Sequence, residues 1–320
     1  MMAAGVAGVP GSDLLRICYF IQNHRTAPQL ARLVGTLRRF QPEALVLVGH
    51  DEFAGLATAT EIRRAVEADV FPLREPCRRG YFSLIQPYFD ALERLARQGV
   101  SYDWIVYLSG QCYPVQPLKR FEERLAEGDA DGFLRFWEAW NPDNPWGRAN
   151  QGVRRYGYQY RDVPGCPPQA LRILRPLNGI QSRVHVHLTY GPRVGWRRPS
   201  PFGPGLVCYG GRQWTTLRRE CAEEVLEESR ARPELIEWFR HTLCPDEAVV
   251  QTLLVNCGRF RLVDDDLRYV DFVGGRRGHP RTLTAADLPE ITGGRYYFAR
   301  KLDLETDPEL FDRLDSWIDR

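Results

Sequence analysis

Over the first 115 residues, apolar runs that end in polar residues alternate with segments of helical spacing. The runs "LLRICYFIQNH", "EALVLVGHDEF", "DWIVYLSGQCYPV" and the shorter "DVFPL" predict buried strands. "APQLARLVGTLRRF" and "YFSLIQPYFDALERLARQG" predict helices, and the second tolerates or kinks at Pro87. This alternation implies right-handed βαβ units and a largely parallel sheet that is covered by helices on both faces.

Polar residues follow three of these predicted strands, at the point where each strand ends. They are His24, Asp51 and the segment Ser109-Gly110-Gln111. In open parallel sheets, ligands bind beyond the carboxyl ends of the strands. The pattern therefore predicts a binding cleft at this edge of the sheet.

Residues 136–205 have a different composition, rich in Trp, Pro, Gly and Asn, as in "FWEAWNPDNPWGRANQG" and "GWRRPSPFGPG". Long loops inside a compact domain are usually functional. The tryptophans are either platforms for sugar rings or simple packing cover, and the sequence does not choose between them. "SRVHVHLTY" alternates and places His185 and His187 on one strand face, but no third metal ligand is near in sequence.

From residue 206 onward the pattern becomes helical again. "GLVCYGGRQWTTLRRECAEEVLEES" predicts a strand, a Gly-Gly turn and a long helix from near Arg218. In "HTLCPDEAVVQTLLVN", a proline and two carboxylates precede an apolar helical run. Pro245 suits the first helical position, and Asp246 and Glu247 complement the helix dipole there. A helix start accounts for this stretch without any function.

Composition excludes several classes of protein. The 320 residues carry 43 basic and 41 acidic side chains, so no global charge points to nucleic acid or to an anionic membrane. The basic clusters "GWRRP" and "GGRRGHPR" fit either small-ligand phosphates or solvated loops. The eight cysteines are scattered, which favours buried free thiols. With no long apolar segment and no evident signal peptide, we expect a cytoplasmic protein without a transmembrane segment, either free or peripheral to the membrane.

Six motifs in register carry a family resemblance. They are "YLSGQCYPV", "GGRQWTTLRRE", "CPDEAVVQTLLVN", "LRYVDF", "HPRTLTAADL" and "YFARKLD", which together span roughly residues 14 to 317. In their order and intervals they resemble the core-2/I-branching N-acetylglucosaminyltransferase and peptide xylosyltransferase family.

The resemblance implies a single α/β domain of the GT-A type, with a mostly parallel sheet flanked by helices. A flexible tail (1–12) would precede the domain (13–320). Within the domain we expect a nucleotide-binding half (13–135), a loop-rich acceptor region (136–205) and a catalytic and diphosphate-binding half (206–320). The resemblance also implies a UDP-sugar donor, inversion at the anomeric carbon and catalysis without a cofactor or a divalent metal.

By the family pattern, Glu247 of "PDE" is the general base, and Asp246 orients the site or binds the acceptor. Single-step inversion needs one base on the acceptor hydroxyl, and cations that stabilise the departing diphosphate. Arg300 and Lys301 of "FARK" match the family's diphosphate-binding residues, and Arg276, Arg277 or Arg281 of the basic loop could add to them.

The nucleoside half of the donor would lie against His24 and Asp51, and Trp214 of "GGRQWTTLRRE" is assigned to substrate binding as well. Two positions depart from the family pattern. Arg79 stands where relatives often have Trp, so the wall around the uridine or the sugar would differ. Cys112 stands where relatives often have Asp, which leaves no metal ligand at that position.

The donor sugar is either N-acetylglucosamine or xylose. The acceptor would be a glycan, a polysaccharide precursor or a small molecule, and no nucleic-acid partner is expected. Two alternatives stay open. One is a non-catalytic sugar-nucleotide or glycan-binding protein on the same fold. The other is a metal-dependent GT-A enzyme that uses the acidic triplet Asp264, Asp265 and Asp266, which we interpret as a turn at a strand edge.

Overall fold

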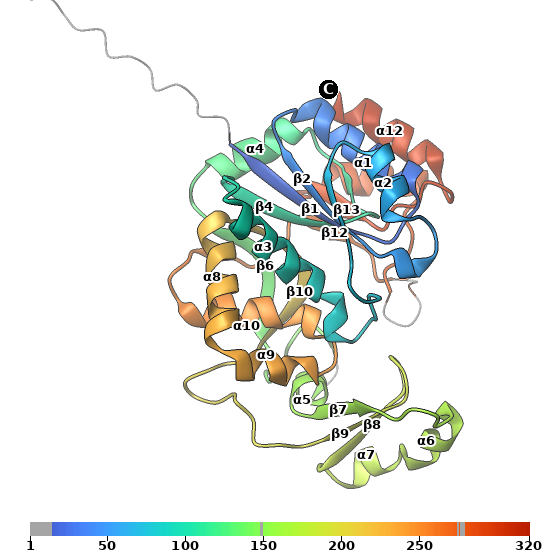
Figure 1. Ribbon diagram of the computed structural model, residues 1–320, viewed down its shortest axis with the longest axis vertical. Helices are drawn as coiled ribbons and strands as arrows, with labels where there is room; N and C mark the ends of the chain where they lie inside the picture. Colours follow the sequence, from blue (N-terminus) through green and yellow to red (C-terminus); the bar gives the residue numbers. More distant parts are fainter. Residues whose placement is uncertain (1–14, 148–149, 274, 276–278) are drawn as a thin grey trace, which may run out of the picture.

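The computed structural model describes residues 15–147, 150–273, 275 and 279–320. The expected tail at 1–12 and the basic-loop residues Arg276 and Arg277 lie outside these ranges. The main feature is a seven-stranded sheet (Figure 1). In the order in which they lie side by side, its strands are β11 (Leu262–Val263), β6 (Gly132–Glu138), β10 (Tyr209–Arg218), β4 (Trp104–Ser109), β1 (Ile17–Asn23), β2 (Leu45–His50) and β3 (Asp69–Pro72).

Most neighbours in this sheet are parallel, as the sequence predicts. β1 pairs in parallel with β2 and β4, β2 with β3, and β11 with β6. β10 is the exception, because it runs antiparallel between β4 and β6. The expected α/β class, with a mostly parallel sheet flanked by helices, is confirmed.

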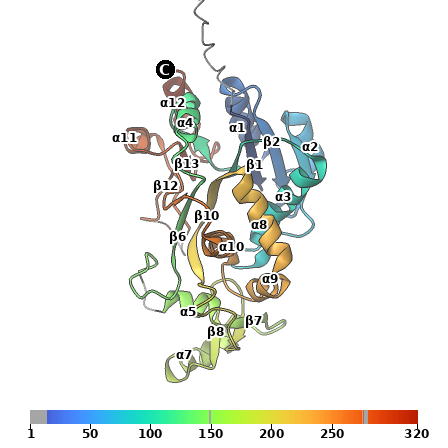
Figure 2. The ribbon, with the colours of Figure 1, turned by 90° about the vertical axis from the view of Figure 1, so that its left-hand side faces the viewer.

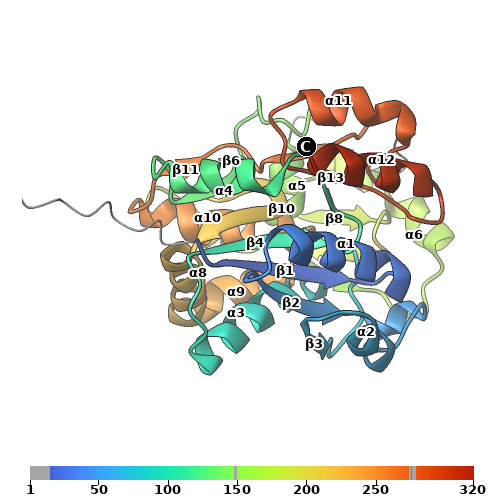
Figure 3. The same ribbon diagram turned by 90° about the horizontal axis from the view of Figure 1, so that it is seen from above.

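Helices cover both faces of the sheet, which Figure 3 shows from above. One face packs on α1 (Ala27–Phe40), α2 (Ala59–Ala65), α4 (Leu118–Ala126), α11 (Leu288–Gly293) and α12 (Pro308–Ile318). The other face packs on α3 (Gln86–Gln98), α8 (Arg219–Ala231), α9 (Pro233–Arg240) and α10 (Val249–Cys257). Successive strand side chains point to opposite faces, so Tyr19 joins the first core and Phe20 the second.

Two smaller sheets complete the fold. The first consists of β12 (Arg268–Val270), β13 (Phe298–Arg300) and β5 (Tyr113–Pro114). The second consists of β7 (Gln159–Asp162), β9 (Arg193–Trp196) and β8 (Val184–His187). With α5 (Gln151–Tyr156), α6 (Pro168–Leu174) and α7 (Leu177–Ile180), this second sheet forms a unit at one end of the molecule (Figure 2).

Several local predictions need correction. The predicted Gly-Gly turn is wrong, because β10 runs through Gly210 and Gly211 with a bulge instead of reversing. The helix predicted from Pro245 begins at Val249, because Ala248 leaves the helical conformation (φ −147°) and Pro245–Glu247 form a separate 3-10 turn. A 3-10 turn at Phe82–Leu84 likewise precedes α3, so Pro87 lies in the first helical turn and causes no kink.

All eight cysteines are unpaired, as the sequence predicts, but only five are buried, since Cys77, Cys166 and Cys257 are partly exposed. There are two further 3-10 turns in the described residues: one, Glu52–Ala54, follows β2, and the other, Ala285–Asp287, precedes α11. Among the described residues, no helix has the length and apolar character needed to cross a membrane.

Candidate active site

The ends of β1, β2 and β4 meet at one edge of the sheet, as expected. Asn23 pairs in register with His50, and its Nδ2 lies 2.9 Å from His50 Nδ1. Asn23 Oδ1 accepts a hydrogen bond of 3.1 Å from the backbone N–H of Arg25. A Cβ atom on Gly110 would fall 2.0 Å from that same oxygen. Glycine at position 110 therefore lets the three strand ends approach closely.

Asp51 is buried at this edge, and backbone groups use its carboxylate. Oδ1 accepts from Phe53 N at 3.0 Å and Oδ2 accepts from Cys77 N at 2.9 Å. These bonds tie the segment that follows β3 to the end of β2. The structure thus gives Asp51 an architectural role, and its contact with the nucleoside stays a prediction.

A group of cations borders the strand edge, which we call the cation cluster: Arg25, Arg79, Arg300 and Lys301. Loss of hydration, followed by the charges of Arg300, Arg79 and Arg25, lowers the pKa of Lys301 to about 8. Burial also lowers the pKa of Arg300. Asp303 forms an ion pair with Arg25 at 2.7 Å. No carboxylate among the described residues forms an ion pair with Arg300 or Lys301.

Two histidines lie within the field of this cluster. His24 is exposed, but partial loss of hydration and the charges of Arg25 and Lys301 lower its pKa to about 4. The pKa of His279 is lowered to about 4 by loss of hydration and then by Arg79 and Lys301. Both imidazoles are therefore neutral near pH 7, and neither adds to the positive charge.

Trp214 packs against Arg300 of the cation cluster. The Arg300 guanidinium lies 4.1 Å from the centre of the Trp214 ring, and that ring meets Tyr107 edge-on at 5.2 Å. Trp214 is only 5% exposed. The structure places this residue under a diphosphate-binding candidate, so little of its ring is open to a substrate.

Glu247 is held by an arginine that the sequence did not indicate. Arg155, on α5, forms an ion pair with Glu247 Oε2, and its guanidinium lies 4.4 Å from the centre of the Trp146 ring. Glu247 Oε1 makes no hydrogen bond within the described residues, and the side chain is 31% exposed. One oxygen is thus anchored and the other is accessible. Arg155 is 92 residues away in sequence, in "QGVRRY", and no motif marks it.

Asp246, the neighbour of Glu247, is in a different environment. Its side chain is buried, and Oδ1 has no hydrogen-bond partner among the described residues. Burial, followed by the charge of Glu247, raises the pKa of Asp246 to about 7. A carboxyl group of this kind can exchange a proton or a hydrogen bond with a ligand near neutral pH.

The carboxylates and the cation cluster belong to one region. The charge of Arg79 acts on both Asp246 and Lys301. The backbone carbonyl of Gly80, next in sequence, accepts from Cys244 N at 3.3 Å, directly before the "PDE" turn. Gly80 has a φ of +81°, and a Cβ there would lie 2.4 Å from the Tyr190 ring. Arg79 thus joins two groups that are distant in sequence.

Residues 198–293 match the family model described as "Branch: Core-2/I-Branching enzyme". This segment of the chain matches the family that the motifs indicated. The match covers under a third of the 320 residues and contains Trp214, Asp246 and Glu247. A match to the Core-2/I-branching family supports glycosyltransferase activity.

Comparison with curated proteins gives no match. Among solved structures, the chain is similar to a nucleoside-diphosphate-sugar pyrophosphorylase from Vibrio cholerae RC9, at 13% identity and a TM-score of 0.34, over 77% of this chain and 89% of that one. It is also similar to a cytidylyltransferase from Leptospira borgpetersenii serovar Hardjo-bovis, at 18% identity and a TM-score of 0.28, over 38% of this chain and 54% of that one.

Within the segment that matches the Core-2/I-branching family, the three carboxylates of the acidic triplet have three different partners. Asp264 Oδ1 accepts from Phe136 N at 2.9 Å, and Asp265 Oδ1 accepts from Leu267 N at 2.8 Å. Asp266 is buried and faces Arg212 at 3.4 Å. In the part of the chain that the structure describes, no three His, Cys, Asp or Glu side chains are grouped as metal ligands.

Two further candidates are engaged elsewhere. His185 Nδ1 lies 2.9 Å from the Tyr160 hydroxyl, and the His187 ring contacts the Tyr190 ring at a tilt of 34°, with ring centres 4.9 Å apart. Arg281 forms ion pairs with Asp271 and Asp287. The Arg281 guanidinium is thus already neutralised, unlike that of Arg300.

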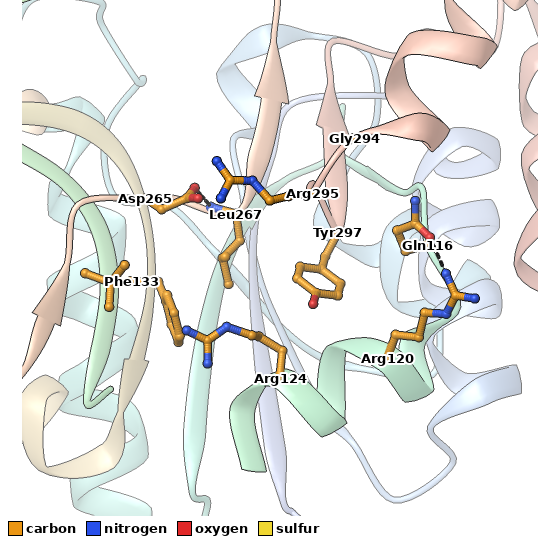
Figure 4. A pocket seen from close by; sticks show the side chains of 10 residues that line it. Gln116, Arg120, Arg124, Phe133, Asp265, Leu267, Gly294, Arg295 and Tyr297 are labelled. Carbon is orange, nitrogen blue, oxygen red and sulfur yellow. Dashed lines mark hydrogen bonds between the residues drawn. The ribbon is translucent and has the colours of Figure 1, made fainter. Parts of the chain in front are cut away.

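A cavity of about 340 Å³, lined in part by Asp265, lies away from the cation cluster and from Asp246 and Glu247 (Figure 4). Leu267 and Tyr297, which line it, immediately precede β12 and β13, whereas Arg300 and Lys301 stand at the far end of β13. Arg124, at its wall, already pairs with Glu127 and Asp129. The cavity is therefore separate from the candidate active site.

Proposed function

We propose that this protein is an inverting UDP-sugar glycosyltransferase that works without a divalent metal. It moves N-acetylglucosamine or xylose to an acceptor hydroxyl as a β-glycoside. The observation that carries the proposal is the pairing of two groups in one region. Arg300 and Lys301 present positive charge without a carboxylate partner among the described residues, and Glu247 presents one anchored and one accessible oxygen.

The proposed reaction is a single displacement. Glu247 Oε1 takes the proton of the acceptor hydroxyl as that oxygen attacks the anomeric carbon. Arg155 fixes the carboxylate through Oε2, so the base needs no reorientation during the reaction. The bond between the sugar and the diphosphate breaks on the opposite face, and Arg300 and Lys301 stabilise the charge that develops on UDP.

The remaining assignments stay predictions of the same proposal. His24 and Asp51 lie at the strand edge where the nucleoside would bind, and Asp246 is buried beside the base, where it would bind an acceptor hydroxyl. The acceptor itself would contact the loop-rich region 136–205. The division into 13–135, 136–205 and 206–320, the lack of a cofactor and a cytoplasmic location also stay predictions.

The test is UDP release from a panel of UDP-sugars without acceptor, first in EDTA and then with manganese. We expect slow hydrolysis of one donor, with equal rates in both conditions. Activity lost in EDTA and restored by manganese would contradict metal independence and favour a role for Asp264, Asp265 and Asp266. Tight UDP binding with no release from any donor or with any acceptor would favour a non-catalytic binding protein.

A further inference from the structure

An apolar patch surrounded by arginines projects from the end of the molecule. Ten large apolar side chains are exposed among the described residues, and four of them fall within eight consecutive positions. These four, which we call the aliphatic patch, are Ile173 (79% exposed), Leu174 (45%), Leu177 (39%) and Ile180 (78%). They belong to α6 and α7, at the outer margin of the unit built on β7, β8 and β9 (Figure 1).

Packing and hydrogen bonds fix the two helices that carry the aliphatic patch. Leu171 of α6 is buried, and Asn178 of α7 exchanges two hydrogen bonds with the backbone of Val186 on β8, at 2.9 and 2.7 Å. Leu177 and Ile180 are three positions apart, so they share one side of the helical turn. The exposed side chains therefore lie on helices that are fixed to the small sheet.

The segment that carries the aliphatic patch has charges of a single sign, and the carboxylate that precedes it, Asp162 of β7, is paired with Arg78 and Arg193. Arg172, Arg175, Arg183, Arg197 and Arg198 are all exposed. None of the five forms an ion pair within the residues that the structure describes. The sequence has no Asp or Glu from residue 163 to residue 219. A chain with a net charge of only +2 thus concentrates positive charge around its most exposed aliphatic side chains.

We propose that the aliphatic patch and its arginines form a docking surface for an anionic lipid bilayer. Aliphatic side chains with a rim of cations match the boundary between acyl chains and acidic headgroups. A second copy of this chain fits less well, because a symmetric contact would bring the arginines of both copies together.

Docking of this kind would keep the active site at a fixed height above the membrane. Arg193 of β9, the central strand of the small sheet, is buried, and its Nη1 donates to the carbonyl of Gly80 at 3.1 Å. The backbone N–H of Tyr160 donates to the carbonyl of His241 at 2.6 Å. These bonds join the unit to the segments around Arg79 and the "PDE" turn. The proposal itself does not depend on glycosyl transfer.

The test is co-sedimentation of the full chain with vesicles of phosphatidylcholine alone, or of phosphatidylcholine and phosphatidylglycerol in a two-to-one ratio. We expect binding to the anionic vesicles only, with a loss of affinity as salt increases. Ile173→Ser with Ile180→Ser, and separately Arg172→Gln with Arg175→Gln, should each weaken binding by at least about tenfold, since each arginine near such a surface contributes about fivefold.

Matched controls change the same residue types elsewhere on the surface. Leu56→Ser with Val273→Ser, and Arg64→Gln with Arg97→Gln, should bind like the parent protein. Equal binding to both kinds of vesicle, or equal losses in patch and control variants, would overturn the proposal. A parent protein that ignores vesicles but dimerises through Ile173 and Ile180 would also overturn it, and would assign the patch to a contact between copies.

Discussion

Replacing Glu247 by Gln separates a catalytic role from a structural one. Glutamine keeps the shape of the side chain and can still accept a hydrogen bond from Arg155, but it carries no charge. The Glu247 and Arg155 side chains are 31% and 12% exposed, so solvent partly screens their attraction. The charge of Glu247 also raises the pKa of Asp246, so its removal eases the ionisation of that neighbour beside Arg155. We expect the free energy of unfolding to change by no more than about 1 kcal/mol.

Activity should respond far more strongly than stability. A positioned general base contributes about 10²- to 10⁴-fold, so turnover of Glu247→Gln should fall at least about 10²-fold. UDP affinity should hold, because Arg300 and Lys301 are unchanged. Turnover is measured as UDP release with donor and acceptor, affinity by calorimetry and stability by chemical denaturation.

Asp246→Asn is the matched control, since it makes the same change from acid to amide at the adjacent position. The pKa of Asp246 is raised from 3.8 to about 7, so the folded state holds its proton more tightly than the unfolded state. Its contribution to stability is complete below pH 3.8 and is lost as the pH rises through 7. Asp246→Asn should abolish this decline and keep more turnover than Glu247→Gln. Near-normal turnover of folded Glu247→Gln, or equal losses in both variants, would refute the assignment of the base.

Three further predictions concern the cations and the strand edge. Arg300→Ala and Lys301→Ala should each weaken UDP binding by about 1.5–3 kcal/mol by calorimetry, whereas Arg281→Ala, whose guanidinium is already paired, should leave it unchanged. Because the pKa of Lys301 is lowered to about 8, UDP affinity should fall as the pH rises through 8, and Lys301→Arg should flatten that profile. Gly110→Ala should lower the free energy of unfolding, measured by urea denaturation, by about 2 kcal/mol, since its Cβ would lie 2.0 Å from Asn23 Oδ1. As a control, Gly35→Ala should be neutral or stabilising, because a Cβ there meets nothing within 4 Å. A stable Gly110→Ala variant, a flat pH profile in the parent or unchanged UDP affinity in both alanine variants would contradict the respective argument.

The sequence was sufficient to predict elements whose pattern lies within one segment of the chain. The helix predicted over 27–40 is α1, because its apolar period and the early Pro28 define it within one segment. The meeting of His24, Asp51 and Gly110 at one edge followed from a general property of parallel sheets. The strand ends were therefore predictable before any contact was known.

Contacts between distant segments were not predictable in this way. Gly210 and Gly211 look like a turn, but a Cβ on Gly211 would lie 1.9 Å from Arg135 O and one on Gly210 would lie 2.2 Å from the Trp146 ring. These glycines allow neighbours to approach, which sequence alone does not distinguish from chain reversal. Arg155 was missed for the same reason, because its pairing with Glu247 depends on how the loop-rich region folds back.

The antiparallel insertion of β10 has a consequence for the order in which the chain folds during synthesis. β1, β2, β3 and β4 are complete by residue 109, but β10, the other neighbour of β4, begins only at Tyr209. Until that strand leaves the ribosome, β4 presents an unpaired, apolar edge of the kind that invites association with other chains. Arg300 and Lys301 come later still, and Leu302, which follows them, accepts a hydrogen bond of 3.0 Å from Gln29 Nε2, as Gly110 O also does. A nascent chain therefore carries the strand edge of the proposed donor site long before it carries the cations. A chaperone that shields β4 during this interval would protect the chain while that edge is unpaired.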